Sequence, residues 1–346
     1  MTMKEIALQA GVSVSTVSRI INSPDGSFAR KEVRDRVWAI IEQTGYSPNQ
    51  NAKNLKSKNG TASSISKGTI TCILGRTEKL EENPFFDQVS QAIKRQALEL
   101  GYTVSLTYSI FDTELYQKGR CILSSPADGA IILGRFNKQA AKLLEEHYKN
   151  LLFVGRNQMD VPWDQVLCDG YEATQIALGH LLEQGHQRIA YIGETRNEIR
   201  FQAYLDFLNT QGFKQEQEII AACKQNDGDG GYRGADILLS QVSLLPTAVF
   251  CATDVAAIAA LRCFRKAKIK VPDTLSLISM DNIELSGYVS PMLTTVEMPI
   301  VEIGNVAVQT LINRMEKKHK LPLIIKLPNK LVVRESVCNL NEGIYI

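Results

Sequence analysis

TMKEIALQAGVSVSTVSRIIN, residues 2–22, has the pattern of a helix, a tight turn and a second helix. Thr2 and Glu5 have the spacing of a capping box at the start of the first helix. Gly11 stands at the turn, where a positive φ angle or a close approach of two helices favours glycine. Ser13 can cap the second helix. This arrangement is typical of a helix-turn-helix, which places its second helix in the DNA major groove.

The second helix is expected to have an inward and an outward face. Val17 and either Ile20 or Ile21 would point inward. The outward positions are Val14, Ser15, Thr16, Ser18, Arg19 and Asn22. A third helix is predicted over about 31–44, because it carries an apolar stripe formed by Val33, Val37, Ile40 and Ile41. The pattern alone fits equally a small three-helix bundle that only packs on the rest of the chain.

Charge is distributed unevenly along the 346 residues, a length that predicts two or three domains. Residues 1–58 hold nine Lys or Arg against five Asp or Glu, a balance of +4. The other 288 residues hold 30 against 32, a balance of −2. A basic head on a mildly acidic body suits contact between the head and phosphates, although the excess is modest.

The composition disfavours secreted and membrane proteins. The seven cysteines are odd in number and form no CxxC motif, which indicates free thiols in a reducing compartment. The chain opens directly into an amphipathic helix rather than a signal peptide. No apolar run reaches the ~18 residues of a membrane span. We therefore expect a cytoplasmic protein without a membrane segment.

A predicted linker separates the head from an alternating α/β pattern. KSKNGTASSISKG, residues 56–68, is rich in Ser, Gly and Lys and poor in apolar residues. Beyond it, apolar runs alternate with helical segments, which predicts parallel sheets with helices on both faces. The predicted strands are 70–74, 104–108, 130–133, 151–154, 166–168, 189–192, 219–222, 248–251, 275–280 and 331–333. The predicted helices are 88–100, 138–148, 171–184, 201–211, 232–241, 256–266 and 303–317. So many strands favour two similar lobes with a ligand cleft at their carboxyl ends.

Catalytic signatures are missing from the sequence. It contains no P-loop, no GxGxxG after a strand, no GxSxG and no HExxH motif. Asp169, Asp254 and Asp281 each follow a predicted strand, where binding residues collect in such folds. One such Asp is more often a helix cap than a ligand, but three indicate a polar binding site. We expect a binding protein rather than an enzyme, with no cofactor and no metal.

Three groups of short motifs follow one another along the chain. The head carries Ile6-Ala7, Ala10-Gly11-Val12-Ser13, Thr16-Val17-Ser18-Arg19 and Asn22. The next segment carries Gly45-Tyr46-Ser47-Pro48-Asn49, Ala52 and Leu55. The body carries Asn83-Pro84-Phe85-Phe86, Gly129-Ala130-Ile131-Ile132, Gly185-His186-Gln187-Arg188-Ile189, Thr253-Asp254 and Pro291-Met292-Leu293-Thr294-Thr295-Val296. With these motifs in this order, the chain resembles the lactose-repressor/galactose-repressor (LacI/GalR) family of bacterial transcription regulators over nearly its whole length.

The resemblance implies a homodimer that binds a pseudo-palindromic operator DNA. Arginine can bond guanine O6 and N7, and valine can contact a thymine methyl group. The residues implied to read bases are Val14, Ser15 and Arg19. The residues implied mainly to hold phosphates are Thr16, Ser18 and Asn22.

The family pattern also implies a division of the chain. Residues 1–47 would form the DNA-binding domain, 48–68 a hinge helix and linker, 69–338 a two-lobed effector-binding and dimerisation domain, and 339–346 a tail. The hinge helix would enter the minor groove, with Leu55 as a wedge beside Asn49 and Ala52. The tail carries no leucine heptad, which favours a dimer over a tetramer.

The two lobes resemble periplasmic sugar-binding proteins. Residues of about 69–157 with 288–317 would form the lobe next to DNA, and 158–287 with 318–338 the far lobe. The effector cleft would be lined by Phe85, Phe86, Arg200, Asn226 and Asp254. Aromatic faces stack on C–H patches, while Asp and Arg bind paired hydroxyls, so a sugar is the expected effector. Asn226 stands where relatives often carry a large aromatic residue, which weakens the expectation of a stacked ring there.

The expected function is therefore that of a sequence-specific repressor of a sugar-utilisation operon, with operator affinity modulated by a sugar. The loop 23–30 is about two residues longer than in the lactose repressor, as in some galactoside-responsive relatives, so a galactoside is a weaker expectation. Met280 replaces the family's usual glycine, and the sequence around the cleft departs from the pattern there. Two alternatives remain at this point, namely an enzyme or sugar-binding module with an incidental N-terminal bundle, and a non-specific architectural DNA binder.

Overall fold

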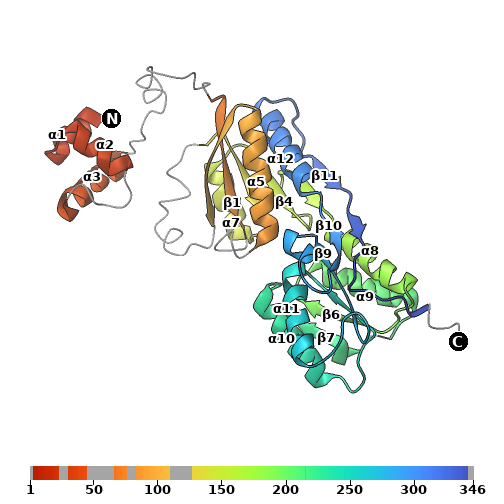
Figure 1. Cartoon of the computed structure of the whole chain (residues 1–346). Helices are drawn as coiled ribbons and strands as arrows, with labels where there is room; N and C mark the ends of the chain where they lie inside the picture. Colours follow the sequence, from red (N-terminus) through yellow and green to blue (C-terminus); the bar gives the residue numbers. More distant parts are fainter. Residues whose placement is uncertain are drawn as a thin grey trace. The chain divides into compact units, whose positions relative to one another are not determined.

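The computed structural model describes residues 3–22, 30–44, 66–75, 83–109, 127–214 and 216–341 (Figure 1). The chain divides into two compact units, Met1–Ile65 and Ser66–Ile346. The predicted hinge residues lie outside the described residues, and they are Asn49, Ala52 and Leu55.

The smaller unit is helical in its described part, which holds α1 (Met3–Ala10), α2 (Val14–Asn22) and α3 (Lys31–Thr44). Its core consists of buried apolar residues from all of these helices: Ile6, Ala7, Ala10, Val17, Ile20 and Val37. Val33, Ile40 and Ile41 pack against this core while half-buried. The apolar stripes expected on the second and third helices are therefore confirmed.

The described part of the larger unit contains two six-stranded sheets. The first has the order β11-β5-β4-β3-β1-β2 and the second β12-β10-β9-β8-β6-β7. The strands of the first sheet are β1 (Gly68–Leu74), β2 (Tyr102–Ser109), β3 (Gly129–Leu133), β4 (Leu151–Gly155), β5 (Asp164–Cys168) and β11 (Ile324–Leu327). Those of the second are β6 (Ile189–Gly193), β7 (Ile220–Ala222), β8 (Ala248–Cys251), β9 (Ser276–Asp281), β10 (Thr294–Glu297) and β12 (Lys330–Val332). Paired strands run parallel, except that β12 is antiparallel to β10.

Helices cover the faces of both sheets. The first sheet carries α5 (Pro84–Glu99), α7 (Lys138–His147) and α12 (Ile300–Met315). The second carries α8 (Gly170–Glu183), α9 (Ile199–Gln211), α10 (Gly228–Gln241) and α11 (Asp254–Lys266). Strands covered on both faces are apolar along their whole length, and β3 (GAIIL) and β4 (LLFVG) are buried throughout. The predicted fold class, a helix-turn-helix head with two α/β lobes of parallel sheets, is confirmed.

Every strand predicted from the sequence overlaps an observed strand, but β10 and β11 were missed. Both are four residues long and neither is an unbroken apolar run, because β10 (TTVE) holds one apolar residue and Lys326 interrupts β11 (IIKL). Strand β11 is an edge strand whose side chains are exposed or half-buried. Their place in the sheets is set by pairing with distant strands, which local pattern does not contain.

The predicted boundaries between the lobes were wrong in three places. Strand β5 pairs with β4 in the first sheet, although residues 158–287 had been expected in the far lobe. Strand β11 also joins the first sheet, by pairing with β5, and β10 joins the second by pairing with β9. The physical reason is strand pairing, because the chain crosses between the lobes after β5, after β10 and after β11. The first sheet therefore combines β1 to β5 with the distant β11, and the second combines β6 to β10 with β12.

Candidate functional site

The turn between α1 and α2 orients the second helix of the smaller unit. Gly11 has a φ angle of +66°, a conformation that disfavours residues with a side chain. The Oγ atom of Ser13 accepts a hydrogen bond from the backbone N–H of Thr16 at 3.1 Å, so Ser13 caps α2 as predicted. Val17 is fully buried on the inner face, which fixes the rotation of α2 about its axis.

The outer face of α2 is accessible in the smaller unit. Val14 is 40% exposed, Ser15 and Arg19 are exposed, and Thr16 and Ser18 are half-buried. The hydroxyls of Ser15 and Thr16 lie 2.7 and 2.8 Å from that of Ser13. Asn22 ends α2. This face offers hydroxyl, methyl and guanidinium groups together, the types of group that contact bases and phosphates.

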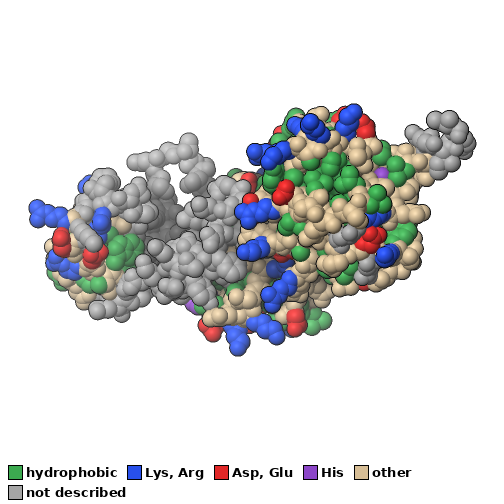
Figure 2. Space-filling model, turned by 90° about the horizontal axis from the view of Figure 1, so that it is seen from below, with side chains coloured by type: hydrophobic (Ala, Val, Ile, Leu, Met, Phe, Trp, Pro, Cys, Tyr) green, Lys and Arg blue, Asp and Glu red, His purple; other side chains and the backbone are tan. Residues whose placement is uncertain are grey.

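Figure 2 shows the charged side chains on one face of the larger unit. Outside the grey atoms, its Lys and Arg side chains stand apart from one another and alternate with acidic and apolar groups. The outer face of α2 is the candidate for contact with nucleic acid, because it offers exposed hydroxyl and guanidinium groups.

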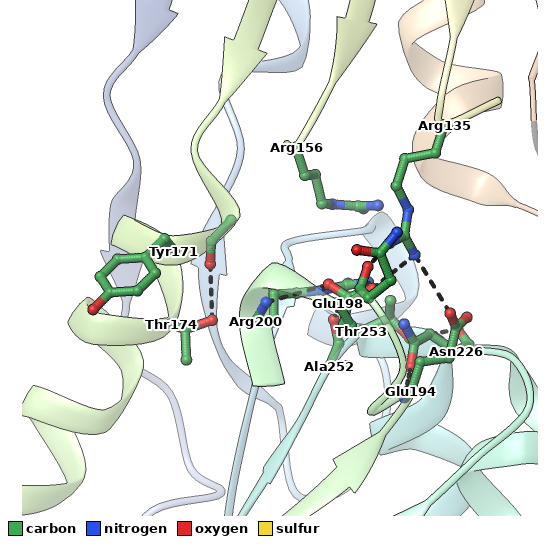
Figure 3. Close-up of polar contacts among 12 residues, drawn as sticks. Arg135, Arg156, Tyr171, Thr174, Glu194, Glu198, Arg200, Asn226, Ala252 and Thr253 are labelled. Atoms are coloured by element: carbon green, nitrogen blue, oxygen red, sulfur yellow. Dashed lines mark hydrogen bonds and ion pairs between the residues drawn. The ribbon is translucent and has the colours of Figure 1, made fainter. Parts of the chain in front are cut away.

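A second candidate site lies between the two lobes of the larger unit, where parallel strands of both sheets end. Arg135 follows β3 and Arg156 follows β4 in the first lobe. In Figure 3 both point toward the second lobe, from which Glu194, Glu198 and Asn226 face them. The carboxyl ends of strands in such sheets are where ligands bind.

Arg156 joins the aromatic pair of α5 to the second lobe. Its guanidinium carbon lies 4.0 Å from the centre of the Phe85 ring and 5.8 Å from that of Phe86. The same guanidinium forms an ion pair with Asp281, at the end of β9. Both phenyl rings are nearly fully buried and pack edge to face, with centroids 5.1 Å apart. In this conformation Arg156, rather than open space, covers the ring of Phe85.

Asp281 is held in an unusual backbone conformation. Its φ angle of +119° is uncommon for a residue other than glycine, and such conformations concentrate at functional sites. Burial raises the pKa of Asp281, while Arg156 and Arg200 oppose that rise. Asp281 therefore contributes a strained, buried carboxyl group to the cleft.

Arg135 forms the other connection between the lobes. Its Nη2 atom lies 3.0 Å from Glu198 Oε2 and 3.4 Å from Glu194 Oε2, and its Nη1 donates to the carbonyl of Asn197. Gly134, with a φ angle of +83°, turns the chain directly before Arg135.

Asp254 is completely buried, and its carboxylate bonds within the second lobe. It accepts hydrogen bonds from the hydroxyl of Thr295 at 2.6 Å, from the hydroxyl of Ser279 and from the backbone N–H of Ile283 at 3.0 Å. Burial and the neighbouring Asp281 raise the pKa of Asp254 to about 7, despite these bonds. In this conformation Asp254 links α11 to β9 and β10.

Two buried donors of the cleft have no hydrogen-bond partner among the described residues. They are Nε of Arg156 and Nδ2 of Asn226. The Oδ1 atom of Asn226 accepts from the backbone N–H of Glu194 at 2.7 Å, which fixes the direction of Nδ2. Buried donors are nearly always satisfied in folded proteins, so these two indicate a ligand or water that supplies acceptors.

The structure thus distributes the predicted cleft residues over both lobes. Phe85 and Phe86 lie in the first, and Arg200, Asn226 and Asp254 lie in the second. The sequence did not indicate that four charged residues connect or line the lobes: Arg135, Arg156, Glu194 and Glu198. It placed Asp281 at the end of a strand but did not indicate its ion pair with the opposite lobe. A signal was available, because a glycine followed by a charged residue stands at or directly after the end of β3, β4 and β6: Gly134-Arg135, Gly155-Arg156 and Gly193-Glu194. Of the three Asp residues expected at strand ends, Asp169 is the helix cap of α8.

The described residues contain no helix that is long and apolar enough to cross a membrane. They also contain no group of three or more His, Cys, Asp or Glu side chains arranged to hold a metal ion.

Comparison with known proteins identifies both parts. Residues 2–49 match the family "Bacterial regulatory proteins, lacI family", and residues 178–337 match "Periplasmic binding protein-like domain". The chain is 30% identical over 348 residues to the "HTH-type transcriptional repressor PurR" of Yersinia pestis bv. Antiqua (strain Antiqua), covering 98% of this chain and 97% of that protein. It is 27% identical over 348 residues to the "HTH-type transcriptional repressor MelR" of Bacillus subtilis (strain 168), covering 96% of each.

A solved structure gives the same result over the whole chain. The "transcriptional regulator CelR-cellobiose complex" superimposes with a TM-score of 0.70 at 25% identity, over 97% of this chain and 99% of that one. A relative at 30% identity over nearly the full length, together with both matching families, establishes the assignment. The chain belongs to the LacI family of bacterial transcriptional regulators, and it is a DNA-binding repressor with a periplasmic-binding-protein-like effector domain rather than an enzyme.

Proposed function

We propose that this repressor binds a sugar in the cleft between its lobes and that the bound sugar changes its affinity for the operator of a sugar-utilisation operon. The observation that carries the proposal is the lining of the cleft, where arginines and carboxylates of both lobes meet beside buried aromatic rings. Two buried donors in this lining lack partners among the described residues, namely Arg156 Nε and Asn226 Nδ2.

The chemistry of this lining suits a molecule with many hydroxyl groups. Each hydroxyl both donates and accepts, so it can bond a carboxylate on one side and a guanidinium on the other. The rings of Phe85 and Phe86 offer faces for C–H patches once Arg156 moves aside. One similar structure is named as a complex with cellobiose. Galactosides are the first compounds to test, because of the long loop 23–30.

On the DNA side, we assign base contacts to the exposed residues of α2, which are Val14, Ser15 and Arg19. We assign phosphate contacts to Thr16, Ser18 and Asn22. The proposal places Asn49, Ala52 and Leu55 in a hinge helix within residues 48–68 that enters the minor groove, and it gives Leu55 the role of a wedge. Two copies of the chain would bind the two halves of a pseudo-palindromic operator.

Coupling between the sites follows from the cross-lobe contacts. A sugar that replaces the Arg135 and Arg156 contacts would change how the lobes pack. This change in packing would alter the spacing of the two hinge segments in the dimer. Coupling of this kind is typically worth ~1–3 kcal/mol, or about 5–150-fold in affinity. Whether the sugar releases or tightens the operator is left to the experiment.

The test is a gel-shift titration of the full-length protein on DNA from its own promoter region, with galactosides, cellobiose and common monosaccharides added in turn. We expect one sugar to change the operator affinity by a factor in the range given above. Size-exclusion chromatography with light scattering should give the mass of a dimer. A protein that binds the promoter with an affinity indifferent to every sugar would contradict the effector assignment while leaving DNA binding intact.

A further inference from the structure

Glu198 occupies a position that the sequence did not reveal as part of the cleft. It lies directly before α9, where its Oε1 atom accepts a bond from the backbone N–H of Arg200 at 3.3 Å and so caps the helix. Its side chain is only 2% exposed. A carboxylate so deeply buried must be compensated by positive groups.

Arg200 supplies the first compensation, from the same lobe. Its Nε lies 2.8 Å from Glu198 Oε1 and its Nη2 lies 3.0 Å from Glu198 Oε2, a bidentate pair, while its Nη1 donates to the carbonyl of Ala252. The edge of the guanidinium that would bind a carboxylate or phosphate of a ligand is thus already occupied by a carboxylate of the protein.

Arg135 supplies the second compensation, from the opposite lobe. It shares Oε2 of Glu198 with Arg200, at 3.0 Å (Figure 3). Burial alone would raise the pKa of Glu198, but the two arginines lower it to about 2. Glu198 is therefore ionised and lies between two guanidinium groups, one on each side of the cleft.

The charges in the cleft balance. Arg135 faces Glu194 and Glu198, Arg200 faces Glu198, and Arg156 faces Asp281, so three guanidinium groups stand against three carboxylates. An anionic ligand would add a negative charge where each guanidinium already faces a carboxylate, so its desolvation would be only partly compensated, by the Nε–H of Arg156. A neutral polyol would exchange hydrogen bonds without changing the balance of charge.

We propose that Glu198 makes the cleft selective for uncharged effectors: it occupies the guanidinium edges of Arg200 and Arg135 that an anionic ligand would need. The ligand class is then a neutral saccharide and not its phosphate ester or uronic acid. The inference depends on the proposed function only in that the effector binds in this cleft.

The test uses the full-length protein and the variant Glu198→Gln, which keeps the shape of the side chain but removes its charge. The probes are inorganic phosphate and galacturonate, with galactose as the neutral counterpart of galacturonate, measured by calorimetry and thermal shift at constant ionic strength. The wild type should show no saturable binding of either anion. The variant should bind at least one of them saturably, with an affinity about tenfold or more above the upper limit that the wild-type titration sets, the effect of one freed charge-assisted bond. Adding Arg200→Gln to the variant should abolish the gain.

Glu216→Gln is the matched control, because both carboxylate oxygens of Glu216 accept bonds from an arginine of the second lobe, Arg188, but outside the cleft. It should gain no comparable anion binding.

Two outcomes bear against the proposal. Saturable binding of galacturonate or phosphate by the wild type that Arg200→Gln removes would overturn it, and this measurement needs no folded Glu198 variant. So would a folded Glu198→Gln protein without any gain. Indifference of operator binding to every neutral sugar would instead count against the proposed function, since the anion measurements do not depend on it.

Discussion

Arg19 is the cation on the outer face of α2 that bears most directly on operator recognition. Its side chain is exposed, and the capping of α2 by Ser13 together with the burial of Val17 fixes the direction in which it points. An arginine placed in this way can bond two acceptors of a guanine at once.

We therefore expect Arg19→Ala to remove the preference for one base pair of the operator, at a cost of roughly 1–3 kcal/mol, while affinity for unrelated DNA falls much less. Competition binding with operators altered at single positions measures both quantities. Lys4→Ala is the control, because Lys4 is an exposed cation of α1. It should weaken all sequences alike, and the same uniform loss in Arg19→Ala would mean that Arg19 contacts only phosphates.

Asp254 provides a prediction about pH. Burial and Asp281 raise its pKa in the folded chain to about 7, against 3.8 for the ordinary side chain. The folded state therefore holds a proton that the unfolded state has lost. The contribution to stability is complete below pH 3.8 and disappears as the pH rises through 7. The Asp254→Asn variant mimics the protonated side chain. Its free energy of unfolding should therefore not fall as the pH rises from 3.8 through 7, and the variant should gain stability relative to the wild type over this range.

Urea unfolding at several pH values measures the difference. Asp169→Asn is a suitable control, because bonds from Lys326 and from backbone N–H groups outweigh burial and lower the pKa of Asp169. The contribution of Asp169 to the stability of the fold is lost only as the pH falls through its lowered pKa, below the ordinary value of 3.8. If the curves of the wild type and Asp254→Asn stayed parallel from pH 4 to 8, Asp254 would be ionised throughout.

At the scale of elements, the sequence predicts most of what the structure contains. The apolar runs of β3, β4, β6 and β8 are local signals, and each lies where it was expected or beside the predicted boundary. The caps Ser13 and Asp169 are local signals as well. The short strands β10 and β11 were missed because their pairing partners are far away in the sequence. The ion pairs of Arg135 and Arg156 across the lobes were not predicted for the same reason, since the partners Arg156 and Asp281 are 125 residues apart in the sequence.

One buried carboxylate, that of Asp164, connects β5 to α12 and to the segment that leads into β11. Asp164, fully buried at the start of β5, accepts from Arg314 Nη2 at 2.6 Å, from the backbone N–H of Leu323 at 2.8 Å, and contacts His319 Nε2 at 2.9 Å. Asp164→Asn leaves Arg314 without its carboxylate, so we expect the larger unit to lose about 3 kcal/mol of unfolding free energy. Chemical unfolding monitored by circular dichroism measures the loss.

Glu316→Gln is the control for Asp164→Asn. Glu316 pairs with Lys318 at the end of the same helix, but both side chains are largely exposed. Exposed ion pairs contribute about 0–1 kcal/mol, so this variant should stay close to the wild type. If the two substitutions changed the unfolding free energy equally, the contacts of Asp164 would not stabilise the larger unit more than an exposed ion pair does.

At the scale of the whole molecule, the lobes are tied by three crossings of the chain and by the ion pairs of Arg135 and Arg156. The sequence pattern predicted that two lobes exist, but it assigned β5, β10 and β11 to the wrong ones. Alternation of strands and helices gives the class of fold, whereas the membership of each sheet depends on pairing over long distances. The effector cleft is a product of that pairing, which is why only part of its lining could be predicted.

The two units have separate cores, and this leads to a prediction about the whole chain. Among the described residues, the core of the smaller unit draws on residues 3–41, and the core clusters of the larger unit begin at residue 70. A protein that starts at Ser66 should therefore fold, keep the thermal transition of the larger unit and keep its sugar binding, while losing operator binding completely. Calorimetry and gel shift measure these properties side by side with the full chain. The opposite result, a fragment that folds but no longer binds the sugar, would mean that residues 1–65 complete the effector site, and coupling between head and cleft would then be direct contact rather than a change in lobe packing.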